Sequence, residues 1–447
     1  MDKAFNISHN WLDAPDKDPL MQWTSASIGI TVNNTNATFN VNTESLSTSE
    51  RADLAFYPMA LWFVRCWWRL HWETGNVWLD KKQQNPYWRM AHELTSAGYG
   101  YIWPDLTFVS DGRDMTILGR STSYPGEASP INYLKNLKLS IPIQSFTDEI
   151  ARCVHIVLDR LESSPAIGLV DTELRQHWTA VMEEQQDPVA AKYRKIEAML
   201  GFNPDEADES LLEAFIKRAD TLGTGIVEEL AAIMPNPAGN ILADLDAIAQ
   251  NSQDLGIKGN FSIPDGISKA GILRGKLKPF EIGRQLASEL RAKCGASTDK
   301  ISDQVISDLM GTSVNAWASH TGTSPFTLGV INPDDDSIRI IFKSKAKRSR
   351  RFQACRLVAD KLISNADNHW FPVSSAATVR QKIQRAFAGE FLCPFERLND
   401  FLGGHYDEDS IAEAAEYFDV SEQVPITHLV NRGYMVPDAL NNDQAAL

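Results

Sequence analysis

The sequence lacks closely spaced cysteine pairs and an excess of basic residues. No two of its five cysteines form a Cys-x-x-Cys pair, which argues against a zinc ribbon or redox motif and favours reduced thiols in the cytoplasm. These cysteines are Cys66, Cys153, Cys294, Cys355 and Cys393. The formal net charge of −15 argues against a general nucleic-acid coat, because phosphate binding requires an excess of Lys and Arg. Nucleic acid is therefore a disfavoured partner.

The sequence also lacks a long uncharged hydrophobic run. Its most apolar stretch, residues 55–72, contains Pro58, Arg65 and Arg69, at depths where a bilayer would penalise the charges. The first 20 residues are polar and carry Asp and Lys, so we expect no signal peptide. These features predict a cytoplasmic protein without a membrane partner, in which residues 55–72 form a buried amphipathic helix.

The residues that are present predict an α+β protein of several domains. A chain of 447 residues exceeds the usual size of one domain. We expect an N-terminal α+β domain at 1–126, a mainly helical middle domain at 127–275 and a C-terminal α+β domain at 276–440. Glycine and proline punctuate 235–275, which we interpret as a linker or covering loop with one short helix at 241–249.

Tryptophan is concentrated in the N-terminal domain. Seven of the twelve tryptophans lie between residues 62 and 103, and such a group could offer a stacking surface for nucleobases or another ligand. The helical spacing of Trp62, Trp67, Trp68 and Trp72, with arginines between them, is more typical of one face of a packed helix. We therefore predict that these rings form core.

Alternating apolar residues predict two hairpins in the same domain. One joins residues 27–32 to 37–41 through Asn33-Asn-Thr-Asn36, and the other joins 106–109 to 115–118 through a tight Ser-Asp-Gly-Arg turn. Further along the chain, apolar residues at helical spacing predict a helix capped by Ser145. The middle domain then continues with helices at 190–200, 211–219 and 226–233.

The C-terminal domain has a distinctive order of elements. Two helices, at 282–290 and 301–310, precede a hairpin of strands at 326–331 and 337–342. Next come a basic run at 343–351, the entry Arg350-Arg-Phe352 to an apolar helix, and Phe387-Ala-Gly-Glu-Phe-Leu-Cys-Pro394. A closing pair of helices contains Ala414-Glu-Tyr-Phe-Asp-Val-Ser421 followed by Asn431-Arg-Gly433. Over residues 280–435 this order resembles the ImmA/IrrE family of metallopeptidases.

The resemblance implies a zincin-like fold whose zinc ligands have been replaced. In that family the helix after the Arg-Phe entry carries His-Glu-x-x-His, and the three essential positions fall here on Arg356, Leu357 and Asp360. The third family ligand, a glutamate, falls near Gln381 or Ile383. Since a catalytic zinc needs two imidazoles one helical turn apart and a carboxylate to activate water, we expect no metal, no cofactor and no catalytic residue.

The expected function is therefore binding. We predict a non-catalytic regulatory or sensing protein that binds a protein partner through a pseudo-metallopeptidase domain, and the resemblance implies settings such as prophage control, stress response or antiviral defence. Arg356 and Asp360, one helical turn apart, are expected to form an ion pair in place of the metal. In the basic run, Arg348, Arg350 and Arg351 are candidate binding residues.

Two other function classes remain open on the sequence. A divergent metal-dependent hydrolase would use relocated ligands among His369, His405, Asp407 and His428, or would be a nuclease with Asp105 and Asp114 holding Mg²⁺. A DNA-binding regulator would use the basic run at 343–351. These histidines do not have zincin spacing, and no acid-x-Lys motif lies beside the two acids. Both observations favour the non-catalytic interpretation.

Overall fold

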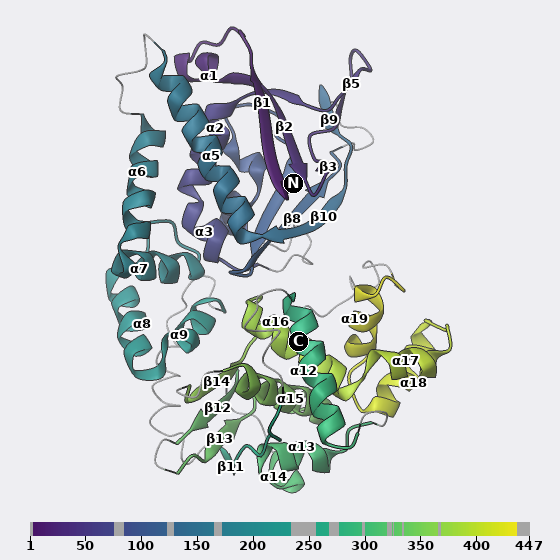
Figure 1. Ribbon diagram of the computed structural model, residues 1–447. Coiled ribbons are helices and arrows are strands. Elements are labelled where there is room, and N and C mark those ends of the chain that lie inside the picture. The colour runs from purple at the N-terminus through teal and green to yellow at the C-terminus, as the bar shows by residue number, and fades with distance from the viewer. Residues whose placement is uncertain are drawn as a thin grey trace. The chain divides into compact units, whose positions relative to one another are not determined.

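The computed structural model is a mixed α+β protein of two compact units (Figure 1). Unit 1 covers Met1–Ile216, and unit 2 covers Lys217–Ile233 and Pro237–Leu447. The structure describes residues 3–75, 85–122, 129–164, 172–233, 256–267, 277–296, 300–319, 324, 326–332, 335–364 and 368–435. Within these residues the strands form four small sheets, and every strand pairing in them is antiparallel. The α+β prediction is therefore confirmed.

Unit 1 contains three of these sheets and most of the tryptophans. Its strands are β1 (Phe5–Trp11), β2 (Ser25–Val32), β3 (Thr35–Asn36), β4 (Asn40–Asn42), β5 (Thr48–Ser49), β6 (Ala52–Ala55), β7 (Asp105–Ser110), β8 (Asp114–Arg120), β9 (Ile131–Tyr133) and β10 (Leu137–Pro142). Its helices are α1 (Pro19–Trp23), α2 (Phe56–Arg65), α3 (Trp67–Trp72), α4 (Pro86–His92), the 3-10 helix η2 (Leu94–Ala97), α5 (Ile143–Glu162), α6 (Glu173–Gln186) and α7 (Pro188–Met199). Helix α8 (Glu209–Leu222) spans the boundary with unit 2.

Both predicted hairpins are present. The first closes at Asn33 and Asn34, whose φ angles of 43° and 66° lie in the left-handed region that asparagine tolerates in tight hairpin turns. The position of its second strand was predicted wrongly: β3 lies within the segment assigned to the turn. The predicted strand at 37–41 is represented only by β4, which pairs with β5 and β9. The second hairpin joins β7 to β8.

The tryptophan cluster forms core, as predicted. Helices α2 and α3 cover residues 56–72 with a break at Cys66, and five tryptophans are at most 9% exposed. They are Trp62, Trp67, Trp68, Trp88 and Trp103, whereas Trp72 is partly buried and packs against this core. Trp78 and the predicted helix at 241–249 lie outside the described residues. Across the part of the chain that is described, no helix is both long and apolar enough to cross a bilayer.

Helix α5 belongs to unit 1, which differs from the predicted division into three domains. It begins at Ile143, two residues before the predicted Ser145 cap, and the amide of Ile143 donates to the carbonyl of Arg113 in the turn between β7 and β8. Its apolar positions, including Val154 and Val157, are buried as the spacing predicts, and the helix packs on β1, β8 and β10. This burial explains why α5 joins the N-terminal sheets.

Unit 2 has one sheet with helices packed on it (Figure 1). The sheet has the order β11-β13-β12-β14, with β11 (Ile257–Gly259), β12 (Thr327–Ile331), β13 (Ile338–Ile341) and β14 (Trp370–Val373). The helices are α9 (Thr224–Ala231), α12 (Pro279–Lys293), α13 (Asp303–Met310), α14 (Val314–Ala318), α15 (Lys347–Ile363), α16 (Val379–Leu392), α17 (Phe395–Leu402), α18 (Glu408–Phe418) and α19 (Gln423–Asn431). Strand β11 comes from the predicted linker, so part of that segment is an edge strand.

Helices α12 and α16 pack closely at Gly283. A Cβ atom built there would lie 2.5 Å from the carbonyl oxygen of Ile383, 2.8 Å from the Cβ of Ala386 and 2.8 Å from the amide nitrogen of Phe387. Because two of these atoms are backbone, the helices would have to separate to admit a methyl group. Gly283→Ala is expected to lower the free energy of unfolding by about 1–3 kcal/mol in urea denaturation, whereas Ser288→Ala, at an exposed position of α12, should change it little. An unchanged midpoint in Gly283→Ala would contradict this packing.

Candidate functional site

The candidate site is a group of buried polar side chains in unit 2, where α15 and α16 pack together. We call it the arginine cluster. Its members are Arg356 and Asp360 from α15, Arg380, Gln381, Gln384 and Arg385 from α16, and Glu229 from α9. Arg356, Asp360, Gln381, Gln384 and Glu229 are each at most 4% exposed. Such groups rarely enter a core without mutual pairing, so their contacts define what the site can do.

Local sequence places these residues on facing sides of the two helices. Arg356 and Asp360 are four residues apart on α15 and therefore share one face. Helix α16 begins after Thr378, whose hydroxyl accepts a hydrogen bond from the amide of Gln381 and caps the helix. That cap fixes the first turn of α16 and directs Arg380 and Gln381 toward α15.

Asp360 is paired with Arg380. The guanidinium donates from Nε to Oδ1 at 2.7 Å and from Nη2 to Oδ2 at 2.8 Å, a bidentate geometry that arginine and carboxylate favour. The predicted Arg356–Asp360 ion pair is therefore wrong. Arg356 instead donates from Nη2 to the carbonyl of Ser374 at 2.7 Å and to Oε1 of Gln381 at 2.5 Å.

Gln381 is one of the two positions at which the resemblance places the third ligand. Its side chain accepts from Arg356 and from the amide of Ser374, and its Nε2 donates to the carbonyl of Pro372 at 3.0 Å. Ile383, the alternative position, is buried in the apolar core of unit 2. Three of the four positions singled out by the resemblance, Arg356, Asp360 and Gln381, therefore lie in one cluster, while Leu357 is a fully buried core residue.

Burial dominates the electrostatics of the cluster. It lowers the pKa of Arg356 well below its ordinary value, with a further contribution from the neighbouring Arg385, and it lowers the pKa of Arg385 to about 10. Burial likewise raises the pKa of Asp360 and of Glu229, against the opposing effect of Arg380. Each of these groups is held in an environment that disfavours its charge unless an opposite charge stays close.

Four members of the cluster were not predicted from the sequence: Arg380, Gln384 and Arg385 on α16, and Glu229. Glu229 comes from α9, outside the segment with the family resemblance, and its Oε1 accepts a hydrogen bond of 2.6 Å from the hydroxyl of Thr378. Its Oε2 is buried without a partner among the described residues. A signal was present, because Glu229 interrupts the apolar pattern of Ile226, Val227 and Leu230, all of which are buried.

The predicted binding arginines of the basic run mostly support the fold. Arg350 is buried and donates to backbone carbonyls, including those of Lys345 and Ala318. Arg351 is 2% exposed, pairs with Asp303 and donates to the carbonyl of Ile301. Neither side chain is exposed for the predicted binding role, because the two guanidinium groups satisfy backbone carbonyls and a carboxylate inside unit 2.

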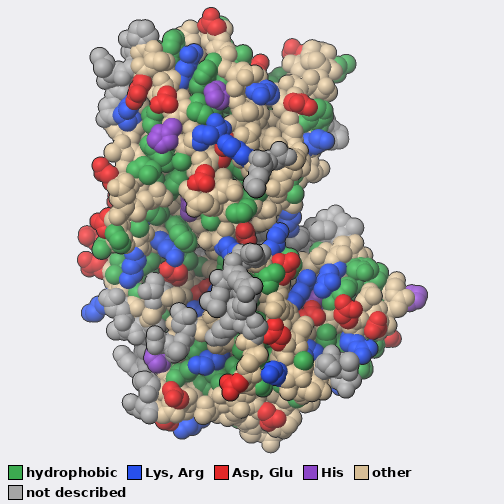
Figure 2. Space-filling view, viewed as in Figure 1, with side chains coloured by type: hydrophobic (Ala, Val, Ile, Leu, Met, Phe, Trp, Pro, Cys, Tyr) green, Lys and Arg blue, Asp and Glu red, His purple; other side chains and the backbone are tan. Residues whose placement is uncertain are grey.

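Arg348 remains at the surface, where its Nε lies 3.2 Å from Asp419. On the face in Figure 2, Lys and Arg side chains are interspersed with Asp and Glu side chains. The basic run at 343–351 is thus partly buried and partly neutralised by carboxylates. It presents less free positive charge than its composition suggests.

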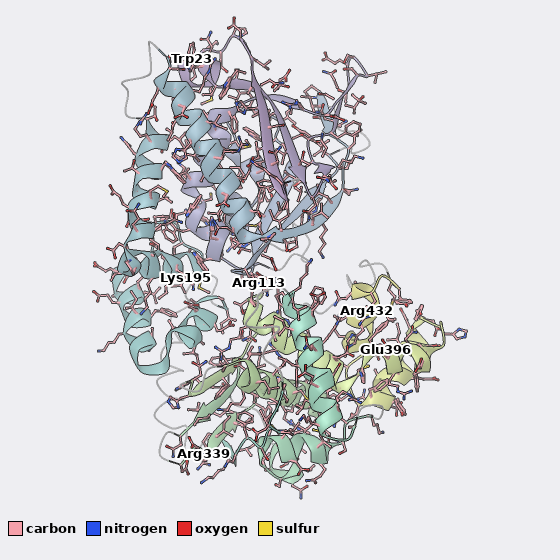
Figure 3. The ribbon with its side chains drawn as sticks, in the orientation of Figure 1. Trp23, Arg113, Lys195, Arg339, Glu396 and Arg432 are labelled. Atoms are coloured by element: carbon pink, nitrogen blue, oxygen red, sulfur yellow. The ribbon has the colours of Figure 1, made fainter. Side chains whose placement is uncertain are left out.

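The alternative metal ligands are not gathered. His428, on α19, is buried beside Phe395. The guanidinium of Arg432, a residue labelled in Figure 3, lies 4.3 Å from the centroid of the Phe395 ring. Asp407 instead caps α18 through Ser410. In the part of the chain that the structure describes, including His369 and His405, no group of three or more His, Cys, Asp or Glu side chains is placed to hold a metal ion.

The two acids of the nuclease alternative lie at opposite ends of their hairpin. Asp105 pairs with Arg120 in the β7–β8 ladder, whereas Asp114 begins β8 next to the turn. Six residues of extended strand separate their positions, which is about 20 Å. One Mg²⁺ cannot bridge this distance, so the predicted pairing of these acids is wrong.

No protein-family model, no curated protein and no solved structure matches the chain.

Proposed function

We propose that unit 2 is a pseudo-metallopeptidase domain that acts by binding a protein partner. The observation that carries this proposal is that Arg356, Asp360 and Gln381, the positions which the resemblance assigns to zinc ligands, lie together between α15 and α16. Arg356 and Asp360 share one face of α15, so the informative contact is the hydrogen bond between Arg356 and Gln381, which lies on a different helix. The proximity of these three therefore supports the zincin-like interpretation.

The order of elements gives further support. Helices α12 and α13 precede the β12–β13 hairpin, α15 begins in the basic run, and α16 ends immediately before Cys393 and Pro394. Helices α18 and α19 then close the unit. This is the order on which the resemblance was based, and α15 packs against β12 and β14 of the sheet.

The chemistry of the cluster favours binding over hydrolysis. Arg356 is a cation and has no lone pair to offer a metal. Asp360 is engaged by both nitrogens of the Arg380 fork, and Leu357, at the position of the family's general base, is an apolar core residue. Without two imidazoles and a carboxylate base, neither zinc retention nor water activation of the family's type is available. The role in prophage control, stress response or phage defence follows from family analogy alone.

The proposal predicts that a zinc site can be restored. Arg356→His, Asp360→His and Gln381→Glu would supply three ligands, and Arg380→Gln would remove the cation that loses its partner. We expect the purified fourfold variant to retain about one equivalent of zinc, measured by mass spectrometry of metals, because two imidazoles one helical turn apart and a carboxylate are the usual zinc ligands. The wild-type chain should retain none.

A matched control places the same two histidines elsewhere on α15. Val358→His with Leu362→His keeps the four-residue spacing but faces the apolar core, so no third ligand is available. Zinc-dependent stabilisation provides a second readout if the fourfold variant is poorly folded without metal, because binding then promotes folding. If the fourfold variant binds zinc no better than this control, the assignment of the former ligand positions is wrong.

A further inference from the structure

Glu229 is an unusual occupant of the arginine cluster. Its carboxylate is 4% exposed and receives one hydrogen bond, from Thr378. Meanwhile Oε2 of Glu229, Nε of Arg356 and Oε1 of Gln384 are all buried without partners in the described part of the chain. Leaving buried donors and acceptors unpaired costs about 1–3 kcal/mol each. The hydrogen-bonding capacity of the buried Glu229 carboxylate is therefore only partly satisfied.

The surroundings of Glu229 form an anion site. Thr378, which donates to its carboxylate, is the N-cap of α16, a helix of 14 residues, and the N-terminus of a helix favours negative charge. Arg356, Arg380 and Arg385 all interact electrostatically with Glu229. Asp360 neutralises only one of these arginines, so the cluster without Glu229 would hold two excess positive charges.

Helix α9 presents this carboxylate from an apolar face. Ile226, Val227, Leu230 and Ala231 are at most 2% exposed, and α9 packs against β14 of the sheet in unit 2. The helix is short, with eight residues, and starts after Gly223, which has a φ of 94°. A helix of this length has little stability of its own, so its position depends on the site it occupies.

We infer that α9 fills in cis a docking site for a partner helix that carries a glutamate between aliphatic residues. The site is the arginine cluster at the N-terminus of α16, together with the adjoining surface of β14. The partner helix would replace α9, placing its own carboxylate beside Thr378 and the arginines. This inference rests on the proposed binding function and names the chemistry of the partner.

The carboxylate site is tested first by chemical rescue. Glu229→Ala removes a methylene group and the carboxylate bonded to it, which together have the heavy atoms of acetate. We expect the melting temperature of Glu229→Ala to fall below that of the wild type and to rise by about 2–4 °C in saturating acetate relative to chloride at equal ionic strength. Glu228→Ala, its neighbour on α9, should show no acetate-specific rise. Equal rescue by chloride or phosphate would overturn the carboxylate assignment.

Docking is tested with a labelled peptide that has the sequence of residues 222–233. Its fluorescence anisotropy is measured against the full-length wild type and full-length Glu229→Ala. Because α9 competes with the peptide for the same site, weakening α9 by Glu229→Ala should increase the apparent affinity of the protein for the peptide at least about tenfold. A peptide with glutamine in place of Glu229 should bind Glu229→Ala at least about tenfold more weakly, as expected for loss of a buried charge-assisted contact.

The outcomes separate the two proposals. No peptide binding to either protein, or equal binding of the glutamate and glutamine peptides, would overturn the docking inference. Neither experiment involves zinc, and the zinc-restoring variant leaves Glu229 unchanged. Failure of the zinc test therefore counts against the pseudo-metallopeptidase assignment, and failure of the peptide test counts against this site.

Discussion

Asp360→Leu is expected to lower the free energy of unfolding by about 3–5 kcal/mol, because it leaves the guanidinium of Arg380 without its buried partner. Asp360 is fully buried and accepts two hydrogen bonds from Arg380. The side chain of Arg380 is only 16% exposed, so water cannot fully replace the carboxylate. Urea denaturation of the wild type and the variant, analysed with a common slope, measures the difference.

Two further variants distinguish the loss of this ion pair from a general effect of mutation. Asp360→Leu combined with Arg380→Met removes both charges, and we expect it to recover much of the lost stability, because an apolar pair of similar volume is often tolerated where an ion pair was buried. Asp400→Ala breaks the exposed Arg397–Asp400 pair and should cost at most about 1 kcal/mol. If the double variant were as unstable as Asp360→Leu alone, the unpaired guanidinium would not be the cause.

Acidification is expected to destabilise unit 1 through His71. Burial lowers the pKa of the His71 imidazole to about 4 from an ordinary value of 6.5, and its ring nitrogens lie 2.7 Å from the carbonyl of Trp67 and 2.8 Å from the hydroxyl of Thr147. Between pH 6.5 and 4 the unfolded chain binds a proton that the folded chain does not. Stability therefore falls as pH falls through this window, by about 3 kcal/mol for this group.

The effect of His71 is measured by comparison with His71→Gln. Urea denaturation at pH 7 and pH 4.5, followed by tryptophan fluorescence, should show a smaller loss on acidification in this variant. The comparison is needed because burial raises the pKa of Glu197, so protonation of that carboxyl opposes the effect of His71. His155→Gln, at an exposed position, is the control and should keep the full pH dependence. An equal loss in the wild type and in His71→Gln would exclude His71 as the source.

Local sequence patterns predicted many of the secondary-structure elements. The asparagine turn at Asn33 and the glycine turn at Gly112 identified hairpins because few residues tolerate a positive φ. Helical spacing located α5, α7, α8 and α9 within a few residues, since burial of one helix face requires that period. The misplaced cap at Ser145 and the missed β14 and α6 show the limit of local patterns. At the start of α5, for example, the amide of Ile143 donates to the carbonyl of Arg113, a contact between residues far apart in the chain.

The candidate site was only partly predictable. The family resemblance selected Arg356, Asp360 and Gln381, and all three belong to the arginine cluster. The predicted partner of Asp360 was wrong. The i,i+4 spacing makes an Arg356–Asp360 pair available, but it does not show that Arg380 on the next helix donates two hydrogen bonds to the same carboxylate. The resemblance also could not assign the buried roles of Arg350 and Arg351.

The sequence by itself determined the α+β class and the tryptophan core, because composition and local period depend on neighbouring residues in the chain. Only the tertiary structure decided that Glu229 lies in the arginine cluster and that Asp105 and Asp114 lie apart. The physical reason is that a buried charge takes its partner from whatever element packs against it. For Glu229 that partner, Thr378, is 149 residues away in the chain.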